Sequence, residues 1–223
     1  MIARFQKLCL DSTEPSRIGP FWAAILHREW QPNGVGEGGV LGPSPQHTLW
    51  FHRVPDPKTV KHRVHLDIYT ESLAALEALG STVVLPGSDD RRWTVMADLE
   101  GGEYCAFLRD EPLAERLHGL VVDSVDPASQ AAWWAEVYGG DLVGDQDGFS
   151  TVEHVPGMPI LTLDFVPVPE PKSVPNRIRW DVTAERIQPL LDAGAKVLQP
   201  AGPDRDWTVL ADPEGNEFRA FPL

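Results

Sequence analysis

Two short segments of the chain place imidazole, carboxylate and thiol side chains at alternate positions. In HRVHLDIY, His65 and Asp67 are two residues apart, and in EYCAFL the same spacing separates Glu103 from Cys105. Because successive side chains of a strand point to opposite faces, each pair shares one face of its strand. His65 could therefore act as a general base oriented by Asp67 or Glu103, and the same side chains could ligate a divalent ion.

These segments belong to an internal repeat. WTVMADLEGGEYCAF, residues 93–107, recurs as WTVLADPEGNEFRAF, residues 207–221, with ten of fifteen positions identical. The same offset of 114 residues places Asp67 on Asp181. Further upstream the offset becomes 112, so the period is close to half of the chain. A duplication of this kind has to be recognised before any fold is assigned.

The period divides the 223 residues into two modules. We place them at residues 1–110 and 116–223, and interpret residues 109–117 as their connection, with a helical turn as one option. Each module is long enough to bury its own core. If the modules are equivalent, Trp93 and Trp207 should occupy similar environments.

Periodicity predicts the same order of elements in both modules. We expect each to contain two βαβββ units, an α+β arrangement, although residues 31–45 read as a glycine- and proline-rich loop. The proline-rich run VPVPEPKSVP in the second module reads as an extended connector. The predicted strands of the first module are RFQKLCLD, HTLWFHRV, HRVHLDIY, STVVL, RRWTVMAD and EYCAFL, and its helices are RIGPFWAAILHREW and ESLAALEALG. In the second module they are the strands LHGLVVDS, RIRWDVT, KVLQP, DWTVLAD and NEFRAF, two strands within residues 149–165, and the helices PASQAAWWAEVYGG and AERIQPLLDAG.

Composition narrows the partners. Nineteen basic and thirty-three acidic side chains give a formal charge of −14, which disfavours nucleic acid and anionic membranes. No apolar run is long enough to span a bilayer. Two cysteines without metal spacing and an N-terminus without a signal-peptide pattern favour a soluble, cytoplasmic protein. Whether it forms a homodimer is left open.

The order of these motifs resembles a known family. HLDI, a short leucine-rich helix, LGSTVVLP and then WTVMADLEGGEYCAF are similar to the glyoxalase-like domains of the vicinal oxygen chelate (VOC) superfamily, which includes glyoxalase I, extradiol dioxygenases and bleomycin-binding proteins. The resemblance covers almost the whole chain. It implies two glyoxalase-like modules, each with a curled mixed sheet forming a cup, ligand inside and helices outside. It implies function less directly, because the fold hosts both metal enzymes and plain binding proteins.

The resemblance also supplies a test for metal binding. Metal-dependent members place a His or Glu on the first strand, a His at the HLD position and a Glu four residues after the glycine of the last turn. The corresponding positions in the first and second repeats are Gln6 and His118, His65 and Arg179, and Cys105 and Arg219. Arginine cannot ligate a metal and glutamine is a weak ligand, so the comparison implies a protein without a metal cofactor.

One arrangement would restore a metal site. Some superfamily members exchange halves between modules, which would let His118 join His65 and Glu103 or Cys105 around Zn, Fe, Mn or Ni. Cys105 can equally be a small buried side chain with no catalytic role. Asp98 and Asp212 open the turn before the last strand of each repeat, where a carboxylate can bind backbone N–H groups.

Two functions follow as alternatives. The first is metal-free binding of a small cationic or aromatic molecule in the N-terminal cup, in the manner of a resistance or sequestering protein. The second is a VOC-type enzyme, a lyase, isomerase or dioxygenase, that uses His65 and Glu103 as catalytic groups or a divalent metal. The ligand-binding residues expected in the N-terminal cup are Gln6, Trp50, His65, Asp67, Glu103 and Cys105.

We expect the two cups to have diverged. Arg179 and Arg219 lie on the same strand faces as Asp181 and Glu217, and buried charges persist only when paired. We therefore predict mutual salt bridges among these four side chains, which would fill the C-terminal cup. The competing possibility is that the two arginines clamp an anionic substrate.

Overall fold

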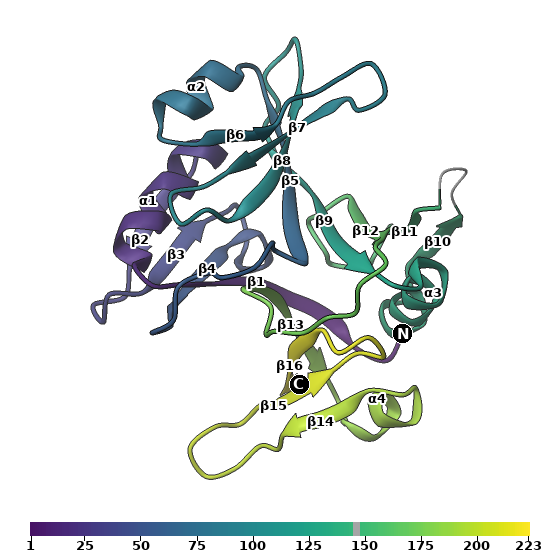
Figure 1. Ribbon diagram of the computed structural model, residues 1–223. Helices are drawn as coiled ribbons and strands as arrows, with labels where there is room; N and C mark the ends of the chain where they lie inside the picture. The colour runs from purple at the N-terminus through teal and green to yellow at the C-terminus, as the bar shows by residue number, and fades with distance from the viewer. Residues whose placement is uncertain (145–147) are drawn as a thin grey trace.

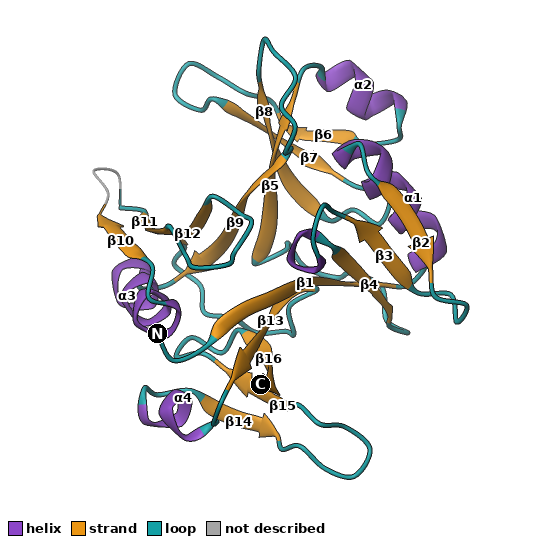
Figure 2. Ribbon diagram, turned by 180° about the vertical axis from the view of Figure 1, so that it is seen from behind, coloured by secondary structure: helices purple, strands orange, loops and turns teal. Residues whose placement is uncertain are grey.

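Two mixed eight-stranded sheets form the framework of the protein (Figures 1 and 2). The computed structural model describes residues 1–144 and 148–223. Sheet A contains, in spatial order, β14 (Lys196–Gln199), β15 (Thr208–Ala211), β16 (Glu217–Pro222), β13 (Ile178–Ala184), β1 (Arg4–Ser12), β4 (Leu49–Arg53), β3 (Gly38–Leu41) and β2 (Glu29–Pro32). Sheet B contains β10 (Asp141–Gly144), β11 (Ser150–Glu153), β12 (Thr162–Pro167), β9 (Leu117–Ser124), β5 (Val64–Thr70), β8 (Glu103–Leu108), β7 (Trp93–Ala97) and β6 (Thr82–Leu85).

Each sheet combines one half of each sequence repeat. β1 pairs antiparallel with β13 at the centre of sheet A, and β5 pairs antiparallel with β9 at the centre of sheet B. In Figure 1 the purple N-terminal strands therefore share a sheet with the yellow C-terminal ones, and blue strands share the other with green. The predicted tandem βαβββ units and glyoxalase-like modules are confirmed, and the halves are exchanged between repeats. The module limits 1–110 and 116–223 stay a prediction about the repeats as sequence units.

The helices join the two sheets through one apolar core. They are α1 (Pro15–Leu26), α2 (Leu73–Ala78), α3 (Pro127–Tyr138) and α4 (Gln188–Asp192). Trp22 of α1 packs edge-on against Tyr104 of β8, and Trp134 of α3 packs in the same way against Trp180 of β13. Trp22, Trp134 and Trp180 are at most 1% exposed, so all three belong to this core. None of the described helices is long and apolar enough to cross a membrane.

The repeated WTVxADxEG segment has the same structural role in both copies. Trp93 lies 5.7 Å from Phe107 and Trp207 lies 5.3 Å from Phe221, so the predicted equivalence of the two tryptophans is confirmed. Asp98 Oδ1 accepts hydrogen bonds from the backbone N–H groups of Glu100 and Gly102. Asp212 Oδ1 accepts the corresponding bonds from the residues two and four positions later. The turn role predicted for both aspartates is confirmed.

The glutamate of this segment fastens the beginning of a helix. Glu100 accepts hydrogen bonds from Ser12 Oγ, from the N–H and Oγ1 of Thr13 and from the N–H of Glu14, immediately before α1. Glu214 accepts equivalent bonds from residues 124–126, immediately before α3. Each contact ties the second half of a repeat to its first half, which explains why the motif is duplicated.

Several local predictions were wrong. Residues 31–45 contain the end of β2, the whole of β3 and the start of a 3-10 turn, and β10 was also missed. α1 ends at Leu26 because His27 adopts a left-handed conformation with φ of 53°, so the predicted extension to Trp30 does not form. The connection at 109–117 has no helical turn; instead, the Arg116 side chain binds the carbonyl of Ile25.

Candidate functional site

Each sheet has one apolar face in the core and one polar face. In β5 the alternate residues Val64 to Ile68 are at most 1% exposed and belong to the core. His65, Asp67 and Tyr69 consequently lie on the other face, as the alternation predicts. We call this surface the polar face of sheet B, and the corresponding surface of β1, β13 and β16 the polar face of sheet A.

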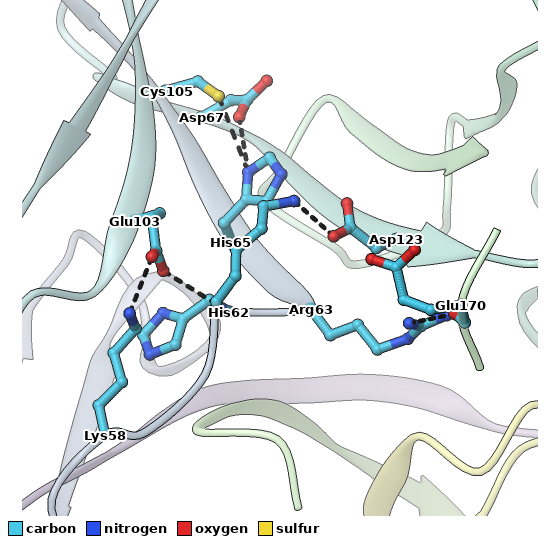
Figure 3. A network of polar contacts seen from close by, with 10 residues as sticks. Lys58, His62, Arg63, His65, Asp67, Glu103, Cys105, Asp123 and Glu170 are labelled. Atoms are coloured by element: carbon cyan, nitrogen blue, oxygen red, sulfur yellow. Dashed lines mark hydrogen bonds and ion pairs between the residues drawn. The ribbon is translucent and has the colours of Figure 1, made fainter. Parts of the chain in front are cut away.

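Three predicted site residues meet on the polar face of sheet B (Figure 3). The His65 Nδ1 atom lies 3.4 Å from Asp67 Oδ1 and 3.9 Å from Cys105 Sγ. Asp67 and Cys105 are direct neighbours across the β5–β8 pairing. All three potential ligand atoms lie within 4.8 Å of one another. This is the same local constellation that the two alternate-residue segments suggested, with Cys105 in the cluster and Glu103 outside it.

Burial determines the protonation of two groups near this cluster. Burial, followed by the charge of Asp67, raises the pKa of the Cys105 thiol well above its ordinary range. The thiol is therefore protonated at neutral pH and is a poor nucleophile. Burial also lowers the pKa of His118 to about 4, which keeps its ring neutral. That ring stacks on Tyr69 at 3.8 Å and meets Phe107 edge-on at 5.0 Å, so His118 forms part of an aromatic wall.

The carboxylate of Glu103 points away from the cluster. It accepts a hydrogen bond of 2.8 Å from Lys58 Nζ and one of 2.9 Å from the backbone N–H of His62 (Figure 3). Although burial opposes ionisation, these bonds lower the pKa of Glu103. We predicted a catalytic role for Glu103, but its carboxylate is already bonded to the loop of residues 58–62. His62 itself is 8% exposed, and burial lowers its pKa to about 4.

Gln6 and Trp50 lie on the other sheet. Both were expected to line one cup together with His65, but β1 and β4 belong to sheet A. The exchange of halves brings His118 of β9 beside β5 instead. Gln6 and His118 each sit where the strand pairing shifts register by one residue, so they occupy equivalent bulges on different sheets.

The charged residues of sheet A do not form the predicted mutual network. Arg179 Nη1 forms an ion pair with Asp11 Oδ2 at 2.5 Å, and Lys7 Nζ forms one with Asp181 Oδ2 at 3.6 Å. Glu217 binds Lys172. The Arg219 guanidinium lies over the ring of Trp207, and its side chain makes no ion pair within residues 1–144 and 148–223. The prediction was wrong because β1, which supplies Lys7 and Asp11, belongs to the first repeat.

One pair of equivalent positions distinguishes the two polar faces. The offset of 112 residues places Lys7 of β1 on Gly119 of β9. Lys7 Nζ lies over the rings of Trp50 and Phe221, at 5.8 and 5.2 Å, while it pairs with Asp181, so its side chain covers this part of sheet A. On sheet B the same place is a glycine beside Asp67.

Residue 119 is a glycine because β5 passes very close to it. A Cβ atom at Gly119 would lie 2.9 Å from the Cβ of Asp67, closer than folded proteins tolerate. No side chain extends from position 119 over the cluster of His65, Asp67 and Cys105. At position 119 the polar face of sheet B therefore lacks the side chain that Lys7 supplies on sheet A, while Asp67 and Cys105 themselves are 7% and 5% exposed.

A further carboxylate next to this cluster was missed by the sequence analysis. Asp164 of β12 accepts hydrogen bonds from Thr151 Oγ1 at 2.6 Å and from Thr162 Oγ1 at 2.7 Å. Burial and then the charge of Asp67 raise its pKa, the two hydroxyl bonds opposing the shift. The sequence did contain a signal for Asp164, because it alternates with two apolar residues, Leu163 and Phe165, which the structure buries to at most 1% exposure. The sequence could not show that Asp164 lies near His65, because β12 comes close to β5 only through the exchange of halves.

The cluster fits a divalent ion in spacing and donor type. Zinc bond lengths imply donor-to-donor separations of about 3.3–3.6 Å in a tetrahedral site, close to the 3.4 and 3.9 Å observed around His65. The donors differ from the alternative metal set of His65, His118 and Glu103. Within the described residues, the cluster that could hold an ion is formed by His65, Asp67 and Cys105.

A model of the glyoxalase-like domain matches residues 7–107 and again residues 119–221. The chain belongs to the glyoxalase-like domain family. The two matches confirm the resemblance stated from the motifs, and they coincide with the two sequence repeats. No curated protein matches the sequence.

Solved structures support the fold of this glyoxalase-like protein. Glyoxalase I from Zea mays is 13% identical, with a TM-score of 0.71, over 99% of this chain and 92% of that one. A candidate dioxygenase from Bacillus subtilis subsp. subtilis str. 168 is 12% identical, with a TM-score of 0.67, over 98% and 84%. The cppA protein from Streptococcus pneumoniae TIGR4 is 10% identical, with a TM-score of 0.53, over 100% of both chains. At these identities the likeness concerns the fold alone.

Proposed function

We propose that this glyoxalase-like protein binds a small cationic molecule, without a metal ion, on the polar face of sheet B. The observation that carries the proposal is the difference between Gly119 and Lys7. On sheet A a lysine already supplies the cation that lies beside Asp181 and two aromatic rings. On sheet B the equivalent aspartate, Asp67, has no such lysine above it, so a ligand can provide the positive charge.

The lining of this face suits a cation with an aromatic or flat group. Asp67 and Asp164 are carboxylates close enough for their charges to interact. Tyr69, Phe107 and His118 form an aromatic wall at one end, and the Arg109 guanidinium lies 4.3 Å from the Tyr69 ring centroid, so this wall already holds one flat cation. Binding without turnover would suit sequestration of a toxic compound. The free thiols of Cys9 and Cys105 support a reducing compartment such as the cytoplasm.

Metal-free binding is favoured over a metal centre by the state of the donors. The Cys105 thiol is protonated unless an ion displaces its proton, because burial and Asp67 oppose its ionisation. Glu103, which could complete a ligand set, is held by Lys58 and by the backbone of His62. The ring of His118 is stacked on Tyr69. Of these side chains, only His65 and Asp67 offer a metal ion a ligand atom without breaking one of the contacts named above.

The proposal is tested by calorimetric titration with benzamidine and benzylamine as cationic aromatic probes and benzoate as the matched anion. We expect the two cations to bind and benzoate not to bind. Asp67→Asn should weaken binding at least tenfold, because it removes the charge and keeps the shape. Gly119→Lys should abolish binding, because the new ammonium group occupies the ligand position.

The matched control is Arg219→Met on sheet A, which should leave the affinity unchanged. Failure of both cations to bind at millimolar concentration would refute the proposal. So would cation binding that Arg219→Met removes and Asp67→Asn does not. If Gly119→Lys fails to fold because of the close approach to Asp67, Asp67→Asn alone decides the result.

A second candidate function is a metal-dependent enzyme of the lyase, isomerase or dioxygenase classes. The specific observation in its favour is the cluster of His65, Asp67 and Cys105. A bound divalent ion would supply Lewis-acid activation of a substrate oxygen, and His65 could take up a proton. Elemental analysis tests this alternative. About one Zn, Fe, Mn or Ni per chain, lost on His65→Ala, would contradict metal-free binding.

A further inference from the structure

A second place for a ligand lies between the two repeats. A cavity of about 720 Å³ is lined mainly by residues 56–63 and 170–177, with Asp11 and Asp123 beside them. The lining sequences DPKTVKHR and EPKSVPNR align at the offset of 114 residues. The cavity is thus bounded by two copies of one segment, one from each repeat. The second copy begins within the proline-rich run, residues 166–175, that we interpreted as an extended connector.

The two segments are fastened in the same way. Lys58 binds Glu103 and Lys172 binds Glu217, each lysine donating to Oε1 of the glutamate at the start of the last strand of its repeat. The other oxygen of each glutamate accepts the backbone N–H of residue 62 or 176. These lysines already have carboxylate partners. They shape the cavity and contribute little net charge to it.

The arginine of each segment crosses to the other segment. Arg63 Nη1 donates to the backbone carbonyl of Glu170 at 2.7 Å, and Arg177 Nη2 donates to that of Asp56. The other N–H donors of these two guanidinium groups are only partly hydrogen-bonded. The Nε and Nη2 atoms of Arg63 and the Nη1 atom of Arg177 are buried without an acceptor among residues 1–144 and 148–223. Buried N–H donors are rarely left in this state.

The carboxylates around the cavity do not neutralise these arginines directly. Asp123 pairs with Lys61 and Asp11 pairs with Arg179. The side chains of Asp56 and Glu170 are exposed and form no ion pair within the part of the chain that the structure describes. Two guanidinium groups, one from each repeat, therefore face the same cavity without a bound carboxylate. This is unusual in a chain whose formal charge is −14.

We propose that this cavity binds a small molecule with two oxyanion groups, one for Arg63 and one for Arg177. Carboxylate and phosphate oxygens match the planar, forked donors of a guanidinium, so both are candidates for the oxyanion. The volume is in the range of ordinary small-molecule sites. The approximate twofold relation of the segments favours a ligand with two similar ends. This site uses Arg63 and Arg177, whereas the proposed cation site uses Asp67 and Asp164.

The test is titration calorimetry with succinate and pyrophosphate as two-group probes, and acetate and inorganic phosphate as one-group probes. We expect one two-group probe to bind at least tenfold more tightly than its one-group counterpart. A preference for succinate or for pyrophosphate identifies the oxyanion. Arg63→Met and Arg177→Met should each weaken binding at least tenfold. Arg205→Met, at an exposed hairpin, is the matched control and should have no effect.

Near-ultraviolet circular dichroism and the melting temperature establish that the variants are folded. If a methionine variant is not, Arg63→Lys and Arg177→Lys replace it, since each keeps the charge and removes the fork. The proposal is overturned if neither two-group probe binds at millimolar concentration, or if binding survives in folded arginine variants. His65→Ala should leave this binding unchanged, so failure here is distinguishable from failure of the sheet B site.

Discussion

Replacement of Glu100 by glutamine tests whether the repeated WTVxADxEG segment is structural. The carboxylate accepts four hydrogen bonds from Ser12, Thr13 and Glu14, at 2.7–3.2 Å. Gln keeps one acceptor oxygen and turns an NH2 group toward the N–H of Thr13. It also removes a negative charge from the beginning of α1. Because charge-assisted bonds contribute about 1.5–3 kcal/mol each and this site is partly solvated, we expect a total loss of about 2 kcal/mol.

The size of the loss should depend on pH. Although burial opposes ionisation, the bonds from Ser12 and Thr13 lower the pKa of Glu100 below its ordinary 4.5. A carboxylate with a lowered folded-state pKa stabilises the protein above the unfolded-state pKa. That stability is lost as pH falls through the folded value. The difference between wild type and Glu100→Gln should be full at pH 7 and shrink below about pH 4.5.

Urea unfolding at pH 7 and pH 3.5, supported by melting temperatures, measures the effect. For a chain of this length, 2 kcal/mol corresponds to a decrease of about 4–8 °C. Glu214→Gln should behave alike, because its bonds to residues 124–126 are equivalent. The control is Glu111→Gln, an exposed position. Loss of less than about 0.5 kcal/mol in Glu100→Gln, matching that of the control, would refute the structural role.

Two further predictions concern the thiols and the exchange of halves. Burial raises the pKa of Cys9 to about 12 and that of Cys105 still further. Both thiols should therefore react with Ellman's reagent at pH 8 at least tenfold more slowly in the native protein than after unfolding. Fast reaction of either thiol in the native protein would contradict this. Expressed alone, residues 1–110 lack β13 beside β1 and β9 beside β5, so light scattering should find a self-associated species; a stable folded monomer would show that the exchanged pairing is dispensable.

The sequence predicted the fold well because its signals were local or duplicated. Alternation identified β5 and β8, and the similarity of residues 93–107 to residues 207–221 identified the repeat. The same signals could not identify β3, whose glycine-rich sequence GGVL resembles a loop. Gly38 is required there because a Cβ atom would lie 2.4 Å from the Gln31 carbonyl oxygen and 2.7 Å from the Trp30 ring, a reason that lies in the strand pairing and not in any local pattern.

The candidate site was predicted in part, for a related reason. His65, Asp67 and Cys105 come from strands of one unit, and alternation placed them on one face. Gln6 and Trp50 were assigned to the same cup because they share a repeat with His65. Strand pairing across the repeats instead brings in His118 and Asp164. Which halves pair is decided by packing between units, and the internal similarity of the sequence is compatible with either pairing.

Exchange of the halves gives a physical account of how the two faces diverged. Each face is built from a β1-type strand of one repeat and a β5-type strand of the other, so a change in either repeat alters one face only. At the first of these positions the chain has Lys7 on sheet A and Gly119 on sheet B. At the second it has Arg179 and His65. Sheet A thus has two cations at these positions, each balanced by a buried or half-buried carboxylate, Asp181 and Asp11. Sheet B has the equivalent aspartate but neither of these two cations, and its Arg109 lies over the ring of Tyr69. Because a buried carboxylate is costly without a partner, the cation that sheet A carries within its own chain is the one that we expect a ligand to bring to sheet B.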